Sequence, residues 1–184
     1  EAVDGDGPWA RVAELAGRLR VQRLTSGALL LPGPPTELRV REGLVGVAPV
    51  AGEESVDLLA EELQVLAESL VGQWCVREGI PAFYLVESLP AAGSDPGGEW
   101  TPARCYAVQR GLSRDRLHLS PEVNPRRGAG PCVPMSRPLE RYTDLLVQQQ
   151  LAHWAATGTA RYSAVELGRV LEESVWAREA GERI

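Results

Sequence analysis

The sequence has no lysine: all 19 of its basic residues are arginines, against 25 aspartates and glutamates. It is also poor in aromatic residues (5%) and has only two histidines. No apolar stretch approaches the roughly 18 uninterrupted residues that a membrane helix needs, so no membrane partner is predicted. A hydrophobic content of 44% and a charged content of 24% exclude wholesale disorder and collagen-like or coiled-coil classes. We therefore expect 184 residues to form one compact unit.

The cysteines are few and widely spaced, at Cys75, Cys105 and Cys132. With no Cys-x-x-Cys pair and no neighbouring pair of histidines, they predict neither a disulfide framework nor a zinc site. We interpret them as small buried hydrophobic residues and expect a reducing, cytoplasmic location. The chain begins at Glu1 without a basic-then-apolar leader, which indicates processing or excision from something longer.

Most enzyme signatures are absent as well. The sequence has no Gly-x-Ser-x-Gly elbow, no phosphate-binding loop ending in Lys-Ser or Lys-Thr, and no dinucleotide fingerprint. His118 stands in a strand-like setting and His153 near a helix end, so both are predicted to be packed or surface residues rather than general bases. The six aspartates form no cluster of the kind that holds two metal ions, and we predict no metal ligands in this chain.

Apolar periodicity and turn residues predict an α+β fold in which small antiparallel strands pack with long amphipathic helices. Helices are predicted over residues 8–24, 53–77, 139–154 and 164–178. The longest has its apolar stripe at Val56, Leu59, Leu63, Leu66, Leu70 and Trp74. A meander is predicted from residues 28–31, 38–40 and 44–47, with further strands over 81–86 and 105–108. Residues 91–98 and 121–138 are predicted to be irregular because they are rich in proline and glycine.

The charges are distributed unevenly along the chain. Residues 42–68 contain acids and no base, whereas residues 104–141 contain eight arginines. Arg126 and Arg127 fall in the irregular segment, where binding residues often lie. Arg137 and Arg141 fall at the start of a predicted helix, whose free N–H groups favour an anion such as phosphate. The alternative is that Glu140 simply neutralises one of these two arginines at the surface.

Four segments carry a resemblance to a known family. Residues 138–151 read PLERYTDLLVQQQL and resemble the TSPIRRYxDL motif, followed by HRxL, of the ribonuclease II/ribonuclease R (RNB) family. Three further matches follow the family's order: Arg23 with Gly27-Ala28-Leu29, the segment LAEELQVLA at 59–67 (LIEEFMLLA in the family), and PAFYLV at 81–86 (PALYRV in the family). The resemblance covers roughly residues 10–180 and identifies residues 1–184 as the C-terminal portion of an RNB-like catalytic domain.

The resemblance implies a processive, Mg²⁺-dependent 3′→5′ exoribonuclease that releases nucleoside 5′-monophosphates from single-stranded RNA. The metal ligands would lie in the N-terminal half of the same catalytic domain, which would be this chain's partner, and RNA-binding domains would flank it. Arg141 is then the catalytic residue expected to stabilise transition-state charge. The expected RNA and phosphate contacts are Arg137, Tyr142, Arg126 and Arg127, with Glu61 and Glu62 as acceptors for ribose hydroxyls.

The sequence also departs from the family pattern. Glu140 replaces the first arginine of the motif's pair, Gln148-Gln149 replace His-Arg, and Glu87-Ser88 replace a His-Glu pair. These departures leave open a second hypothesis, a catalytically inactive RNA-binding or scaffold relative. A third hypothesis is a protein-interaction domain without nucleic acid, in which case residues 104–141 would show no salt-dependent RNA affinity.

Overall fold

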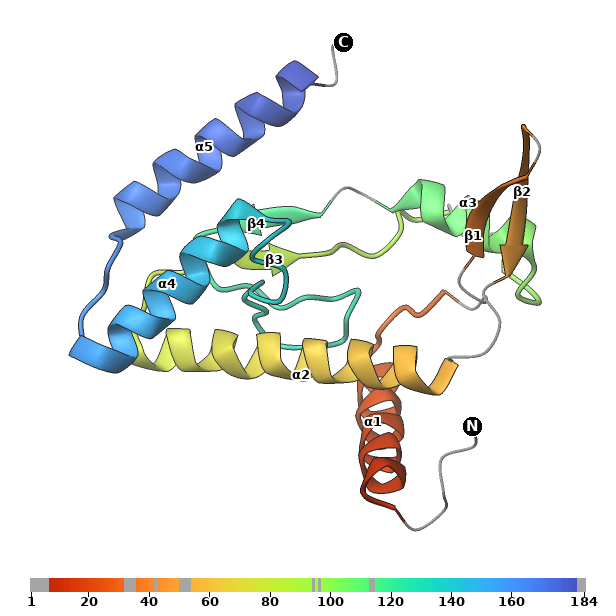
Figure 1. The fold of residues 1–184 in the computed structure, drawn as a ribbon, viewed down its shortest axis with the longest axis horizontal. Coiled ribbons are helices and arrows are strands. Elements are labelled where there is room, and N and C mark those ends of the chain that lie inside the picture. Colours follow the sequence, from red (N-terminus) through yellow and green to blue (C-terminus); the bar gives the residue numbers. More distant parts are fainter. Residues whose placement is uncertain are drawn as a thin grey trace.

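The computed structural model describes residues 7–31, 36–41, 43–49, 54–93, 95, 97–112 and 115–181. Within these ranges, five helices and two small antiparallel sheets form an α+β fold, as predicted (Figure 1). The helices are α1 (Pro8–Thr25), α2 (Glu54–Glu78), α3 (Pro102–Gly111), α4 (Tyr142–Thr157) and α5 (Ala164–Gly181). The strands are β1 (Thr36–Arg41), β2 (Leu44–Pro49), β3 (Tyr84–Val86) and β4 (Arg116–His118). No helix in the described ranges is long and apolar enough to span a bilayer.

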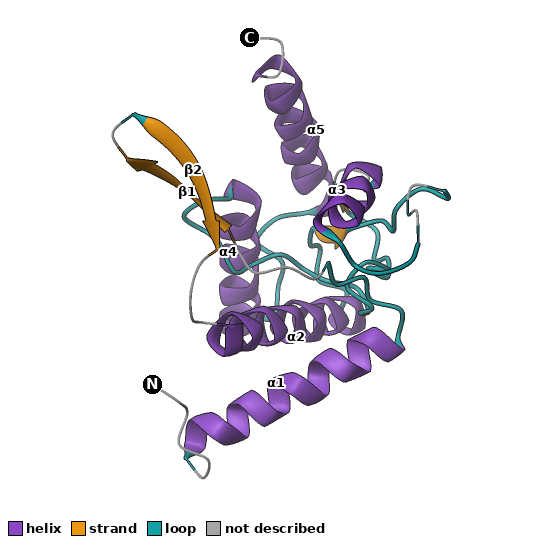
Figure 2. Cartoon of the chain, turned by 90° about the vertical axis from the view of Figure 1, so that its right-hand side faces the viewer, coloured by secondary structure: helices purple, strands orange, loops and turns teal. Residues whose placement is uncertain are grey.

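The long helix α2 is the base on which the other elements are arranged. Helix α1 packs beneath it, and α4 crosses near its C-terminal end (Figures 1 and 2). Helix α1 starts where the sequence predicts, with proline in the first turn, and it ends at the Ser26-Gly27 turn, where Gly27 has a φ of 89°. The predicted helices over 53–77, 139–154 and 164–178 are also present, with ends shifted by up to three residues.

The strands pair differently from the predicted meander. β1 and β2 form a hairpin in which Val40 lies opposite Val45, and this hairpin projects from the rest of the molecule (Figure 2). Residues 28–31 were predicted to be a strand, but they are irregular. Their backbone is tied to a loop instead, because Leu29 N–H donates to the carbonyl of Arg126 at 2.9 Å. β3 pairs with β4.

The predicted strand over residues 105–108 is wrong, because this segment lies inside helix α3. Thr101 caps the helix, since its hydroxyl accepts a hydrogen bond from the Arg104 backbone N–H at 3.2 Å. Pro102 occupies the first turn, where the missing N–H has no cost. These two start signals outweigh the short apolar run that suggests a strand.

The hydrophobic core lies around β3, between the C-terminal half of α2 and the helix α4. Phe83, the sole phenylalanine, is fully buried, and Leu146 of α4 and Leu167 of α5 belong to the same cluster. Cys75 and Cys132 are buried as predicted, whereas Cys105 is only partly buried. Burial raises the pKa of the Cys75 and Cys132 thiols to about 11, so both stay protonated near neutral pH.

The buried face of α2 coincides only in part with the predicted apolar stripe: Leu59, Leu66 and Trp74 are partly buried, and the side chain of Val56 lies outside the described residues. Leu63 is 37% exposed and Leu70 is 55% exposed, whereas Glu62 and Glu68 are each only 1% exposed. Gly72 lies on the buried face, where it touches the irregular segment that precedes α4. A Cβ at this position would stand 1.9 Å from the Pro131 carbonyl oxygen of that segment. The acidic side of α2 therefore faces the interior, and its charges need partners there.

Candidate phosphate-binding site

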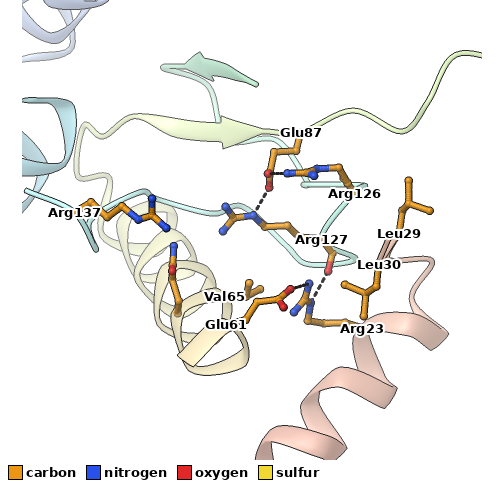
Figure 3. A pocket seen from close by; sticks show the side chains of 10 residues that line it. Arg23, Leu29, Leu30, Glu61, Val65, Glu87, Arg126, Arg127 and Arg137 are labelled. Atoms are coloured by element: carbon orange, nitrogen blue, oxygen red, sulfur yellow. Dashed lines mark hydrogen bonds and ion pairs between the residues drawn. The ribbon is translucent and has the colours of Figure 1, made fainter. Parts of the chain in front are cut away.

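A pocket of about 230 Å³ lies above the buried acidic face of α2, and we call it the arginine pocket (Figure 3). Its lining comes from the end of α1 and the segment after it, from α2, from the end of β3 and from the irregular segment before α4. The lining residues are Arg23, Leu29, Leu30, Glu61, Gln64, Val65, Glu87, Arg126, Arg127 and Arg137. Four arginines, namely Arg23 at the end of α1 and Arg126, Arg127 and Arg137 about a hundred positions later, thus meet around one cavity.

Arg23, in the last turn of α1, joins this helix to α2 and to the irregular segment. Its Nη1 lies 2.7 Å from Glu62 Oε1, and its Nη2 lies 3.6 Å from Glu61 Oε1. Its Nε donates to the Arg127 carbonyl oxygen at 2.8 Å. Glu62 Oε2 is buried without a hydrogen-bond partner in the described part of the chain. One guanidinium therefore fixes three segments of backbone around the pocket.

Arg126 and Arg127 stand in a tight turn that is pressed against the end of α1. Gly128, which follows them, has a φ of +58°, and a Cβ there would lie 2.5 Å from the Arg23 carbonyl oxygen. Buried Asn124 steadies the turn, because its side-chain oxygen accepts the Arg127 backbone N–H at 3.1 Å and its amide donates to the Leu85 carbonyl at 3.0 Å. Only glycine fits this close approach of two backbones.

Two buried glutamates receive the side chains of this turn. Glu87 accepts from Arg126 Nη2 through one carboxylate oxygen and from Arg127 Nε through the other, and the second oxygen also accepts from Asn124 at 3.1 Å. Glu68 Oε2 lies 2.6 Å from Arg127 Nη1. Its other oxygen accepts from Ser136 and from Gln64, at 3.0 and 3.1 Å. Such charge-assisted bonds hold the guanidinium planes in fixed orientations.

The ionisation of the carboxylates follows from this arrangement. Burial favours the neutral form of Glu87, but the positive charges and hydrogen bonds of Arg127 and Arg126 outweigh it and hold the pKa of this carboxyl below its usual value. For Asp115, burial and the negative charge of Glu87 raise the pKa, against the attraction of Arg126, Arg127 and Arg141. The charges of the pocket residues Glu87, Arg126 and Arg127 and of nearby Arg141 thus all act on the Asp115 carboxyl.

A second group of charges lies where α4 begins. Arg141 is the N-cap residue of α4, and its Nη2 lies 2.9 Å from Oδ2 of the fully buried Asp144. The same carboxylate oxygen accepts the Arg137 backbone N–H at 3.0 Å. Asp144 therefore positions both arginines that the sequence places at this helix start. The Arg137 side chain is exposed, with Nη1 3.5 Å from Glu140 Oε2, and this is the surface pair that the sequence left as an alternative.

The structure brings most of the predicted site residues to one region. Arg126, Arg127, Arg137 and Glu61 line the arginine pocket, and Figure 3 shows the Arg127 and Arg137 guanidinium groups pointing toward each other. Three of the predicted residues, Glu62, Arg141 and Tyr142, are not among the lining residues: Glu62 is buried beneath Arg23, Arg141 caps α4, and Tyr142 is 61% exposed on its first turn.

Glu68, Asn124 and Asp144 were not predicted as site residues, and Glu87 was noted only as a departure from the family pattern. A signal for Glu68 was present in its spacing, because it follows Glu61 by two helical turns and so lies on the same side of α2. No comparable signal exists for Asn124, whose role depends on partners 37 to 39 residues away. The two glutamines that depart from the family motif make hydrogen bonds within the fold: Gln148 donates to the Met135 carbonyl oxygen, and Gln149 accepts from the Tyr162 hydroxyl.

The described residues of this chain do not form a magnesium site. Among the described residues, no group of three or more histidine, cysteine, aspartate or glutamate side chains is arranged to hold a metal ion. The carboxylates of the pocket are instead engaged with arginines. The arrangement can orient an anion by hydrogen bonds and charge, which requires no metal from this chain.

Comparisons with known proteins show which proteins the chain resembles in sequence and in fold. No protein-family model matches the chain. The ribonuclease sll1290 of Synechocystis sp. strain PCC 6803, itself described as uncharacterized, is 25% identical to it over 176 residues, which are 92% of this chain and 26% of that protein.

Solved structures with the same fold match most of this chain, which corresponds to about a quarter to a third of each of them. An active-site mutant of the Dss1 exoribonuclease from Candida glabrata superimposes with a TM-score of 0.74 at 15% identity, over 91% of this chain and 24% of that one. RNase R from Mycoplasma genitalium, in complex with ribose-methylated single-stranded RNA, gives 0.66 at 17% identity, over 88% and 31%. Its complex with double-stranded RNA gives 0.67 at 16%, over 88% and 35%. The chain thus resembles a ribonuclease in sequence and shares its fold with part of RNB-family exoribonucleases, spanning about a quarter to a third of each relative.

Proposed function

We propose that this chain is the C-terminal portion of the catalytic domain of a metal-dependent 3′→5′ exoribonuclease that acts on single-stranded RNA in the cytoplasm. In this proposal it supplies phosphate contacts and the wall of the RNA channel, while the Mg²⁺ ligands belong to the N-terminal half of the domain. The supporting observation is the convergence of Arg23, Arg126, Arg127 and Arg137 on one pocket in a fold shared with exoribonucleases.

Arg141 is proposed as the catalytic residue, and its surroundings support that role. Hydrolysis of a phosphodiester develops negative charge on the non-bridging oxygens, and a preorganised guanidinium stabilises that charge. The Arg141 side chain is 37% exposed, so it can reach a ligand, while Asp144 at 2.9 Å limits its freedom. Its buried Nε has no hydrogen-bond partner among the described residues.

Arg137 and Tyr142 are proposed as neighbouring RNA contacts. Arg137 reaches into the arginine pocket from the segment that precedes α4, and its exposed pair with Glu140 is of the kind that contributes little energy and exchanges readily. The ring of Tyr142 is exposed one residue beyond Arg141, where a base can stack on it. Glu61, which is half exposed at the pocket, is the better placed acceptor for ribose hydroxyls, because Glu62 is engaged with Arg23.

A second candidate function, RNA binding without hydrolysis, is favoured by one specific observation. Glu140 carries an opposite charge at the motif position where the RNB family has an arginine, and it pairs with Arg137 instead of adding to the positive charge of the site. The pocket then retains its capacity to hold RNA with less charge available for the transition state.

The experiment is a time course of 5′-labelled single-stranded RNA and Mg²⁺ with the protein that joins this chain to the metal-binding half of the catalytic domain, beside an EDTA control. We expect a shrinking ladder that requires metal and that Arg141→Ala slows about 100-fold. Arg77→Ala is the matched control, because Arg77 is an exposed arginine at the far end of α2 and pairs only with its neighbour Glu78 in the described structure. Its rate should equal that of the wild type.

The outcomes separate the two candidates. RNA that is bound in a salt-dependent manner but never shortened would favour the binding protein over the nuclease. RNA that is neither bound nor shortened would overturn both. A ladder unaffected by Arg141→Ala would retain the nuclease and reject Arg141 as the catalytic residue.

A further inference from the structure

Glu87 holds both arginines of the Arg126–Arg127 turn. It is 2% exposed at the end of β3, and its two carboxylate oxygens accept from Arg126 Nη2, Arg127 Nε and the Asn124 amide. Its backbone carbonyl also accepts the Arg126 N–H, at 3.1 Å. Two guanidinium groups and an amide converging on a pair of oxygens are the donors that a phosphate group selects.

The charges around the arginine pocket are already balanced by the protein. In the described part of the chain, the four lining arginines are paired with five glutamates, namely Glu61, Glu62, Glu68, Glu87 and Glu140. Asp115 adds a further carboxyl within electrostatic range. The pocket is rich in arginine without carrying a surplus of positive charge, so an entering anion must compete with an internal one.

Glu87 is the carboxylate best placed to compete. Glu62 and Glu68 lie beneath the pocket and are not among its lining residues, and Glu61 and Glu140 are exposed and loosely paired. Glu87 lines the cavity itself and takes up donors of two arginines at once. We propose that Glu87 acts as an internal substitute for phosphate, and that it limits the affinity of the arginine pocket for phosphate groups by holding Arg126 and Arg127.

This inference deepens the proposed function and rests on it for the identity of the natural ligand, but its test does not need RNA. The probe is inorganic pyrophosphate, titrated by calorimetry into the wild type and Glu87→Gln. Glutamine retains the length of the side chain and one acceptor oxygen, while it removes the competing charge. Because the donors of Arg126 and Arg127 are then free for charge-assisted hydrogen bonds to the anion, we expect the variant to bind pyrophosphate about tenfold or more tightly.

The matched control is Glu68→Gln. Glu68 is an equally buried carboxylate bonded to the same Arg127, but it does not line the pocket, so its affinity gain should be much smaller. The double variant Glu87→Gln/Arg126→Gln should lose most of the gain, because the released donor is gone. A purely structural role for Glu87 would lower affinity in the variant, never raise it.

The inference is overturned if folded Glu87→Gln protein binds pyrophosphate no more tightly than the wild type, or if Glu68→Gln gains as much. Should Glu87→Gln fail to fold, Glu87→Asp provides the same test, since it withdraws the carboxylate by one methylene and should give a smaller gain. A rise in pyrophosphate affinity without any RNA binding would support the inference about Glu87 and reject the proposed function. If the wild type binds RNA but Glu87→Gln gains no affinity for pyrophosphate, the proposed function is supported and the inference about Glu87 is rejected.

Discussion

Among individual residues, the buried glutamates of α2 link the stability of the fold to the geometry of the candidate site. Glu68 is 1% exposed and accepts hydrogen bonds from Arg127, Ser136 and Gln64. Burying a charge is unfavourable unless its partners are complete, so such a residue stabilises the fold only as part of its network. The same network orients Arg127, and stability and site geometry are therefore coupled at this position.

Glu68→Ala should lower the free energy of unfolding by about 3 kcal/mol, because it leaves Arg127 partly unpaired in a buried position. Glu78→Ala is the control, since it removes a carboxylate whose partner Arg77 is exposed, and it should cost less than about 1 kcal/mol. Urea unfolding followed by circular dichroism measures both. Equal losses in the two variants would mean that the network contributes nothing beyond a surface pair.

The lowered pKa of Glu87 should make the stability of the fold sensitive to acid. The pKa of this carboxyl is lower in the folded protein than its usual value of 4.5, so its ionised form stabilises the fold above that pH. As the pH falls through the lowered folded value, this stabilisation is lost. Glu87→Gln should therefore flatten the decline of the melting temperature below about pH 4.5, relative to the wild type. Parallel curves for the two proteins between pH 3 and 6 would contradict the coupling.

At the scale of elements, the sequence predicts the helices well and the faces of α2 poorly. Periodicity places four of the five described helices, and the missed α3 depends on the Thr101 cap and Pro102. The buried face of α2 is missed because a pattern of apolar residues takes Glu62 and Glu68 for a solvated side. Their partners Arg23 and Arg127 come from 39 and 59 residues away, and a local pattern contains no information about them.

The same limit applies to the candidate site. Arg126, Arg127 and Arg137 could be identified from their irregular, proline-rich surroundings and Arg141 from its motif. Their pairing with Glu87, Glu68, Glu140 and Asp144 depends on tertiary contacts that bring four segments together. These candidate arginines could therefore be identified from the sequence, whereas the glutamates, the aspartate and the charge balance that they form with them could not.

Two glycines inside helices give a matched test of how closely α2 approaches the segment before α4. Gly72→Ala should destabilise the protein by about 1–3 kcal/mol, because its Cβ would stand 1.9 Å from the Pro131 carbonyl oxygen and force the backbone apart. Gly17→Ala in α1 meets nothing within 4 Å and should stabilise it by about 0.4–1 kcal/mol. Chemical denaturation of both variants tests the packing, and a loss of equal size at both positions would contradict it.

At the scale of the whole molecule, the exposed side of α2 is the feature with the clearest consequence. Leu63 and Leu70 are two helical turns apart on one side, and both are exposed. Helix α1 presents Val21 and Leu24 to solvent as well. Apolar side chains that remain uncovered favour association.

We expect the chain to self-associate at high concentration, and Leu63→Gln/Leu70→Gln should reduce this association. Val165→Gln on α5 is the control, because this valine is 66% exposed but lies on a different element. Sedimentation velocity across a concentration series measures the effect. A monomeric wild type, or equal association in all three proteins, would contradict this role for the α2 face.

The ion-pair network beneath the arginine pocket also has a consequence for the order of folding. Its bonds join residues 39, 59 and 104 positions apart, so each one closes a long loop before it gains any energy. Because this cost is met only after other elements have docked, we expect these contacts to form late, once α1, α2 and β3 are in place. Glu68→Gln should therefore speed unfolding while leaving the refolding rate nearly unchanged. The ion pairs beneath the arginine pocket would accordingly form late in folding and break early in unfolding.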